Sequence, residues 1–177
     1  FQLSEFLPGG NFGCFCLFDG GKLVKMAQAE RIEYIMAKVA VSGITGNTSK
    51  GRLLNDEKIR RNALAAIEAL CAQTGETMSG LVVVDMKGDA DGNPLITEIN
   101  IRHVAYSSSF AAAGFNISEY QALLALGRGD EIPAGTEKIF PKGNLILRDV
   151  DGAPIYIEKQ EKLEVGDFVN GRANRGH

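Results

Sequence analysis

The chain has 177 residues, of which 45% are apolar and 23% charged, and its formal net charge is -3. These proportions are typical of a globular domain and argue against a disordered chain. The acidic balance argues against a general nucleic-acid-binding protein, because that role needs a basic surface. No apolar run is long enough to span a membrane, so we expect neither nucleic acid nor a membrane among the partners.

The three cysteines, Cys14, Cys16 and Cys71, are an odd number without disulfide-like spacing. This usage is typical of a reducing compartment and predicts a cytoplasmic protein. The two histidines are dispersed, and together with these cysteines they do not show the paired ligand spacing of a zinc site. We therefore expect the cysteines to behave as small buried hydrophobic residues.

The start of the chain predicts an extended segment, a hairpin and a helix. Residues 5–10 form an extended piece that ends in a turn. Residues 14–18 and 22–27 have the composition of two strands, joined by a tight Asp-Gly-Gly turn at 19–21. Residues 30–40 carry apolar side chains at helical spacing, which predicts a helix.

A loop and a longer helix are expected next. Residues 42–51 are rich in Gly, Ser, Thr and Asn and are typical of a loop. Asn55 or Asp56 is placed to cap a helix with one apolar face that runs to about Gln73.

The second half of the sequence predicts strands at 81–86 and 94–101, followed by helices at 104–113 and 118–127. A final hairpin is expected over 145–158. The two helices meet near Gly114, and Ser118 is expected to cap the second. The final hairpin turns at Asp151-Gly152. Together the elements predict an α+β fold with mainly antiparallel strands.

The strands at 81–86 and 94–101 form a hairpin whose register follows from its turn. If residues 90–93 make a four-residue turn, Asp89 faces Pro94. The other opposite pairs are then Asp85 with Glu98, Val83 with Asn100, and Lys87 with Ile96. Opposite residues share one face of a sheet, with Cβ atoms about 4.5–5.5 Å apart, so the two carboxylates are neighbours.

The other face of this hairpin is apolar. It carries Val82, Val84, Met86, Leu95 and Ile99. A slip of one residue would place the carboxylates in the core, so the pattern supports the predicted register.

The polar face predicts a metal site. Asp85 and Glu98 repel each other unless a cation lies between them. With the amide oxygen of Asn100 they form a set of hard oxygen donors that suits Mg²⁺ or Mn²⁺. Arg102 lies two residues further on the same face and can reach an anion beside the metal.

The sequence offers two other interpretations of this hairpin. A polar face that simply meets solvent remains an alternative from the hairpin alone. A calcium loop of the EF-hand kind is excluded because its Gly and its closing Glu fall at the wrong spacing.

Four segments, taken in order, resemble the second half of the ATP-grasp fold. They are EFLPGG, SGITGNTSKG, the Asp-ending strand and TEINIR. The likeness is strongest to the large subunit of carbamoyl-phosphate synthase and ligases similar to it, and it covers about residues 1–127. It implies an ATP-grasp C-terminal portion at 1–128, with a mainly antiparallel sheet packed by helices. A C-terminal extension with a hairpin follows at 129–177.

The resemblance also implies roles for individual residues. Glu5, Phe6 and Leu7 would form the hinge beside adenine, and Gly43, Ile44 and Thr45 a loop beside the nucleotide. Asp85, Glu98 and Asn100 match the Mg²⁺ ligands, and Arg102 matches a residue that meets the transferred phosphate or the acyl phosphate. Arg31 lies where related proteins carry a phosphate-facing base, and a helix-surface role is the alternative.

The function implied is that of an ATP-dependent ligase with ATP and Mg²⁺ as cofactors. A small-molecule carboxylate would be activated as an acyl phosphate and then attacked by an amine or ammonia. The alternative is a non-catalytic nucleotide-binding or interaction module of the same fold. The chain opens at Phe1 without an initiator Met, so we expect a fragment that lacks the N-terminal half and is inactive alone. Homodimer formation is left open.

Overall fold

The computed structural model describes residues 3–36, 46–149, 152–159, 168–169 and 172–173. Its main feature is a seven-stranded sheet with the order β5-β4-β1-β2-β3-β6-β7, in which every neighbouring pair is antiparallel. The strands are β1 (Asn11–Asp19), β2 (Lys22–Tyr34), β3 (Thr48–Leu54), β4 (Gly80–Gly88), β5 (Pro94–Asn100), β6 (Leu145–Leu147) and β7 (Ile155–Ile157). A separate pair comprises β8 (Phe168–Val169) and β9 (Arg172–Ala173).

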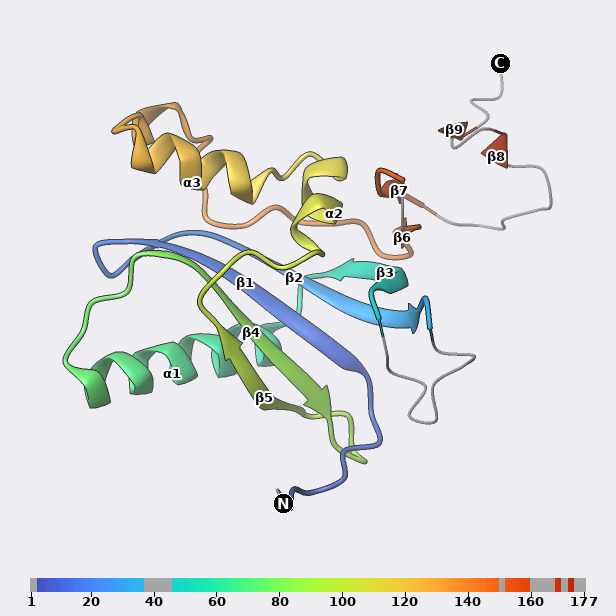
Figure 1. Ribbon diagram of the computed structural model, residues 1–177, viewed down its shortest axis with the longest axis horizontal. Helices are drawn as coiled ribbons and strands as arrows, with labels where there is room; N and C mark the ends of the chain where they lie inside the picture. Colours follow the sequence, from blue (N-terminus) through green and yellow to red (C-terminus); the bar gives the residue numbers. More distant parts are fainter. Residues whose placement is uncertain (1–2, 37–45, 150–151, 160–167, 170–171, 174–177) are drawn as a thin grey trace.

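Helices cover both faces of the sheet. They are α1 (Glu57–Thr74), α2 (Ser107–Ala112), α3 (Ile117–Ala125) and a 3₁₀ turn at Gly129–Glu131. Helix α1 lies against one face, and α2 and α3 lie against the other (Figure 1). The α+β class and the mainly antiparallel sheet are confirmed.

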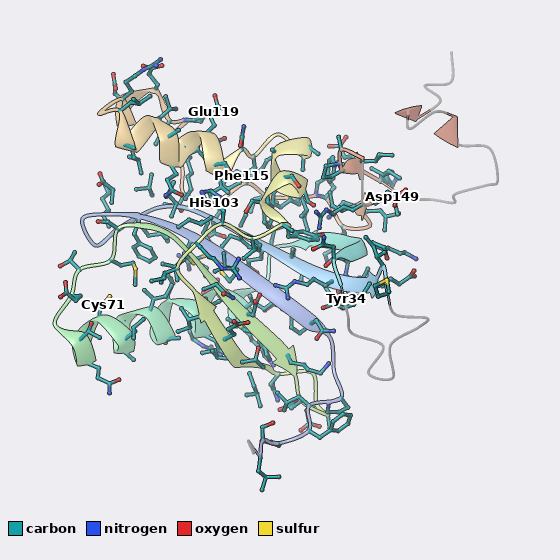
Figure 2. The ribbon with its side chains drawn as sticks, in the orientation of Figure 1. Tyr34, Cys71, His103, Phe115, Glu119 and Asp149 are labelled. Atoms are coloured by element: carbon teal, nitrogen blue, oxygen red, sulfur yellow. The ribbon has the colours of Figure 1, made fainter. Side chains whose placement is uncertain are left out.

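Each face of the sheet has its own apolar cluster because side chains alternate along the strands. Cys14, Cys16, Val82 and Val84 belong to the cluster that packs on α1. The cluster below α2 and α3 contains Phe15, Leu17, Val83, Tyr106 and Phe110. Figure 2 shows Phe115 on the α3 side of the sheet and Cys71 on the α1 side.

The prediction that all three cysteines are buried is confirmed for two of them. Cys14 and Cys16 are fully buried, and their sulfur atoms lie 3.7 Å apart. Cys71 is half-buried on α1, and all three are free thiols.

The first hairpin is confirmed, whereas the helix predicted at 30–40 is wrong over residues 30–34. Gly20 and Gly21 form the turn with positive φ angles of 52° and 82°, as a two-residue hairpin turn requires. Strand β2 then continues to Tyr34, because it pairs with β1 and β3 on its two sides. This pairing outweighs the helical spacing of the apolar residues, and residues 37–40 lie outside the described part.

The caps explain where the helices begin. Asp56 caps α1 by accepting hydrogen bonds from the backbone N–H groups of Lys58 and Ile59 at 2.8 and 3.1 Å, as predicted. Asn116 caps α3 through the N–H of Glu119 at 3.3 Å. The prediction of Ser118 as the cap is therefore wrong, since the helix already begins at Ile117.

Strand β3 occupies the end of the segment that was predicted to be a loop. Thr48 to Gly51 pair with the end of β2, so this part of the loop prediction is wrong, while residues 42–45 lie outside the described part. A side chain at position 51 would collide with Glu30 and with the Tyr106 hydroxyl, and Gly51 avoids both contacts.

The tail contributes to the same sheet. Strands β6 and β7 pair as the predicted hairpin, and β6 also pairs with β3. The division of the chain at residue 128 stays a prediction. Within the described ranges, no helix is both long and apolar enough to cross a membrane.

Candidate functional site

The β4–β5 hairpin places the predicted carboxylates side by side. Asp85 pairs with Glu98, and Val83 pairs with Asn100, as the turn predicted. Beyond Asp85 the register shifts, because Thr97 is an extra residue in β5 and its hydroxyl donates to the Asp85 carbonyl at 3.1 Å.

This bulge corrects three details of the prediction. Lys87 lies opposite Leu95 and not opposite Ile96, and Pro94 lies opposite Gly88 and not opposite Asp89. Leu95 was expected on the buried apolar face, but it is 38% exposed and does not belong to that face. The part of the hairpin that carries Asp85, Glu98 and Asn100 lies on one side of the bulge and keeps its predicted register.

The turn of this hairpin is fixed by Asp89. Its carboxylate accepts hydrogen bonds from the backbone N–H groups of Asp91 at 2.9 Å and Asn93 at 2.8 Å. The side-chain amide of Asn93 adds a third at 3.0 Å. These hydrogen bonds, led by that of Asn93, lower the pKa of Asp89, so the turn is built around an ionised carboxylate.

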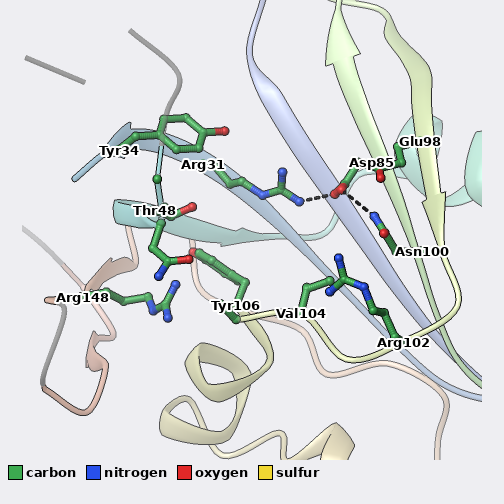
Figure 3. A pocket seen from close by; sticks show the side chains of 13 residues that line it. Arg31, Tyr34, Thr48, Asp85, Glu98, Asn100, Arg102, Val104, Tyr106 and Arg148 are labelled. Atoms are coloured by element: carbon green, nitrogen blue, oxygen red, sulfur yellow. Dashed lines mark hydrogen bonds and ion pairs between the residues drawn. The ribbon is translucent and has the colours of Figure 1, made fainter. Parts of the chain in front are cut away.

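Arg31 on β2 forms an ion pair with Asp85 on β4, across the intervening strand β1 (Figure 3). Gly13 of β1 makes this crossing possible. A Cβ atom there would lie 3.1 Å from the Arg31 guanidinium and 3.5 Å from the Asp85 carboxylate. The bare backbone at Gly13 therefore gives Arg31 its path over β1.

Burial and charge act in opposite directions on this ion pair. Burial raises the pKa of Asp85, and Glu98 adds to this, while Arg31 and Asn100 lower it; the net result is a raised pKa. For Arg31, burial lowers the pKa, but the opposing effects of Asp85 and Tyr34 together are larger. The pKa of Arg31 is therefore raised above its ordinary value. Arg31 thus stays charged and holds Asp85 in a half-buried position.

The donor set fits a divalent cation. Two carboxylates and one amide are hard ligands, and a set of this size leaves positions for water and phosphate oxygens. The Asn100 amide nitrogen donates to Asp85 at 3.3 Å, so a bound cation would require the amide to turn its oxygen inward. Within the described residues, no three His, Cys, Asp or Glu side chains gather, so a cation held by Asp85 and Glu98 would take its third protein ligand from an amide such as that of Asn100.

These residues line a pocket of about 300 Å³ on the face of the sheet that carries α2. Its lining includes Arg31, Asp85, Glu98, Asn100, Arg102, Tyr106 and Arg148 (Figure 3). The pocket is therefore built from β2, β4, β5, the segment before α2 and the tail.

Arg102 is in this pocket as predicted, and His103 is not. Arg102 is exposed, and its guanidinium donates to the His103 carbonyl at 3.1 Å. His103 instead contacts α3 through Gln121 at 2.7 Å and Ser118 at 3.2 Å. Its role in joining this segment to α3 is structural.

Three of the residues predicted to contact the nucleotide, Glu5, Phe6 and Leu7, do not line this pocket. Glu5 and Phe6 are exposed, Phe6 by 84%, and Leu7 is half-buried in the segment before β1. The backbone N–H of Gly9 donates to the Gly88 carbonyl at 2.8 Å, which holds this segment beside the end of β4. Gly43, Ile44 and Thr45 lie outside the described residues, so the roles of these six residues stay predictions.

Sequence reasoning missed Tyr106 and Arg148 as pocket residues, and it missed Gly13 as the residue that leaves room for the Arg31–Asp85 ion pair. Gly13 had one available signal, since it interrupts the buried run of β1 on the face that carries Asp85. Tyr106 and Arg148 had none, because their places depend on how distant segments pack.

Comparison with known proteins identifies the fold. No protein-family model and no curated protein matches the chain. It is similar to the solved L-amino acid ligase from Bacillus licheniformis, with 14% identity over 80% of this chain and a TM-score of 0.52. It is also similar to the biotin carboxylase domain of a thermophilic 2-oxoglutarate carboxylase, solved with ADP and without magnesium. Here the identity is 15% over 81% of this chain and the TM-score is 0.54.

Both solved structures are ATP-grasp proteins. The chain has the ATP-grasp fold. It spans 33% of the ligase chain and 31% of the biotin carboxylase chain, in agreement with a partial ATP-grasp domain. Identities at this level show the fold alone, so the chemistry must be argued from the pocket.

Proposed function

We propose that this chain supplies one side of the active site of an ATP-dependent ligase. In the proposed reaction ATP phosphorylates a carboxylate, and an amine or ammonia then attacks the acyl phosphate. One observation supports this proposal above the others. Asp85, Glu98 and Asn100 lie together in a pocket of an ATP-grasp sheet.

The proposed ligands of Mg²⁺ are Asp85, Glu98 and Asn100. When bound, the cation would neutralise triphosphate charge and polarise the phosphoryl group that is transferred. Arg102 is proposed to meet the transferred group, because an exposed guanidinium at the pocket edge can form two parallel hydrogen bonds to an oxyanion. Neither role requires a covalent intermediate with the protein.

The ion pair between Arg31 and Asp85 adds a role for Arg31. It compensates the half-buried carboxylate while no other cation is bound there. Mg²⁺ would compete for the same carboxylate, and the released guanidinium would then be free to meet phosphate oxygens. Arg31 therefore belongs to the proposed site as a counter-charge on a strand and not as a helix-surface residue.

Similar solved proteins guide the nucleotide assignment. The biotin carboxylase domain was solved with ADP, and the ligase is described as acting on L-amino acids. We propose that this chain likewise acts on a nucleotide and a small carboxylate, together with an N-terminal ATP-grasp half. The more specific likeness to carbamoyl-phosphate synthase stays a prediction.

Titration with Mn²⁺ and ATP tests the proposal. Glu98→Ala should weaken Mn²⁺·ATP binding by at least about tenfold, because it removes a charged metal ligand. In the complete protein the same change should abolish ADP release. Glu68→Ala is the matched control, since Glu68 is an exposed residue of α1, which covers the other face of the sheet.

The outcome separates two functions of this fold. Equal Mn²⁺·ATP binding by Glu98→Ala and the native chain would contradict the metal assignment. Binding without ADP release, whatever carboxylate and amine are offered to the complete protein, would instead favour a non-catalytic module.

A further inference from the structure

The tail brings an arginine into the pocket from outside the hairpin. Arg148 follows β6, and its backbone N–H donates to the Ser49 carbonyl of β3 at 2.8 Å. Figure 3 shows Arg148 and Asp85 at opposite ends of the pocket, with Tyr106 on the Arg148 side. The pocket thus has a carboxylate end and a cationic end.

Arg148 differs from Arg31, another arginine of the pocket, in how its charge is compensated. Among the residues that the structure describes, no carboxylate pairs with its guanidinium, whereas Arg31 pairs with Asp85. Its Nε atom is buried without a hydrogen-bond partner in the same set. The guanidinium lies 5.9 Å from the centre of the Tyr106 ring, which orients it without satisfying its N–H groups.

Tyr106 presents a second polar atom without a partner. The residue is buried, with only 3% of its surface exposed, and its hydroxyl makes no hydrogen bond within the described residues. The hydroxyl fits closely over Gly51, where a Cβ atom would lie only 2.3 Å away. An unpaired buried hydroxyl costs about 1–3 kcal/mol, so a donor kept at this place indicates a ligand that completes it.

We propose that Arg148 and Tyr106 bind an oxyanion of the ligand at the cationic end of the pocket. A carboxylate or phosphate group would accept hydrogen bonds from the guanidinium and from the hydroxyl. The inference rests on the proposed function for the source of this anion, which is either the carboxylate substrate or the nucleotide. It gives the tail a direct part in ligand binding.

The fold favours two separate anion positions in the pocket. A metal-bound triphosphate is drawn to the Asp85 and Glu98 end, because the metal needs those carboxylates. An oxyanion that carries no metal would meet Arg148 at the other end, where no carboxylate pairs with the guanidinium among the described residues. The two ends can therefore hold two reactants at once, as a ligase requires.

Nuclear magnetic resonance of the arginine Nε–H groups of the full chain tests this site. Inorganic phosphate and acetate serve as probes in separate titrations. We expect one or both to shift the Arg148 Nε–H signal in a saturable manner. Arg148→Gln should weaken that binding by at least about tenfold, because a charged bidentate donor is lost.

Three further variants refine the test. Tyr106→Phe removes only the hydroxyl and should weaken binding by a few-fold. Arg148→Lys keeps the positive charge but loses the two parallel N–H donors of the guanidinium. It should bind the anion more weakly than the native chain and more tightly than Arg148→Gln. Arg128→Gln is the control, because Arg128 is exposed and pairs with Glu131 outside the pocket.

The probes distinguish the source of the anion. A response to acetate assigns the site to the carboxylate substrate, and a response to phosphate alone assigns it to the nucleotide. Equal binding by the native chain and a folded Arg148→Gln or Arg148→Lys variant would overturn the proposal, as would the absence of a saturable shift. A lost Mn²⁺·ATP response with an intact Arg148 response would contradict the proposed ligase function and leave the oxyanion site standing.

Discussion

The two faces of the sheet differ in how far their apolar cover extends. On the α1 face, β1 and β4 stay apolar along their lengths, through Cys14, Cys16, Val82, Val84 and Met86. On the opposite face the apolar rows include Phe15 and Val83 and then stop at Gly13 and Asp85. The first face is closed by a long helix, while the second leaves a polar pocket beside α2.

This difference separates stability from function. The apolar residues on the α1 face belong to one buried cluster, so they contribute chiefly through burial. Residues at the pocket end of the other face hold charges that compensate one another only in part. Adjacent residues of one strand therefore serve different ends, because successive side chains point to opposite faces.

The largest effect should come from a charge placed on the α1 face. Val84 is fully buried, and Val84→Asp would bury a carboxylate without a partner. We expect it to lower the free energy of unfolding by about 4 kcal/mol or more. Asp85→Asn, one residue further and on the other face, should cost only about 1–2 kcal/mol through the lost ion pair. Denaturant unfolding measures both, and equal losses would break the comparison.

A smaller effect is expected from removing the counter-charge of Asp85. Arg31→Met should tighten Mn²⁺ binding in the absence of nucleotide by roughly tenfold, because a charge-assisted hydrogen bond no longer competes with the ion. Calorimetric titration measures the change. Arg52→Met is the control, since Arg52 forms its ion pair with Glu30 outside the pocket. Unchanged or weaker Mn²⁺ binding by Arg31→Met would contradict the proposal that the cation competes with Arg31 for Asp85.

The smallest effect concerns the pH dependence of the hairpin that carries the site. Hydrogen bonds from Asn93 and from the backbone lower the pKa of Asp89 in the folded chain. Its contribution to stability is therefore complete above the unfolded pKa of about 3.9 and is lost as pH falls through the lower folded value.

Asp89→Asn should remove this pH dependence. The difference in unfolding free energy between the native chain and the variant should shrink as the pH is lowered through this window. The exposed residue Asp130 supplies the control variant Asp130→Asn. A difference that stays constant across the window would show that Asp89 does not act through its charge.

Local pairing made much of the fold and the central part of the site predictable from sequence. The register of Asp85 and Glu98 depends on a short turn and on alternation within one hairpin, and both are encoded in neighbouring residues. The cap at Asp56 and the turn at Gly20 and Gly21 are local in the same sense. These elements were therefore predicted correctly.

Only the tertiary structure decided how the pocket is completed. Arg31 reaches Asp85 because β2 is a strand and not a helix, and because Gly13 of β1 leaves room above it. Arg148 joins the pocket because β6 pairs with β3, far away in the sequence. The hairpin thus determined by itself where two carboxylates meet. The charges that face them come from long-range strand pairing, which depends on the packing of the whole sheet and on no local pattern.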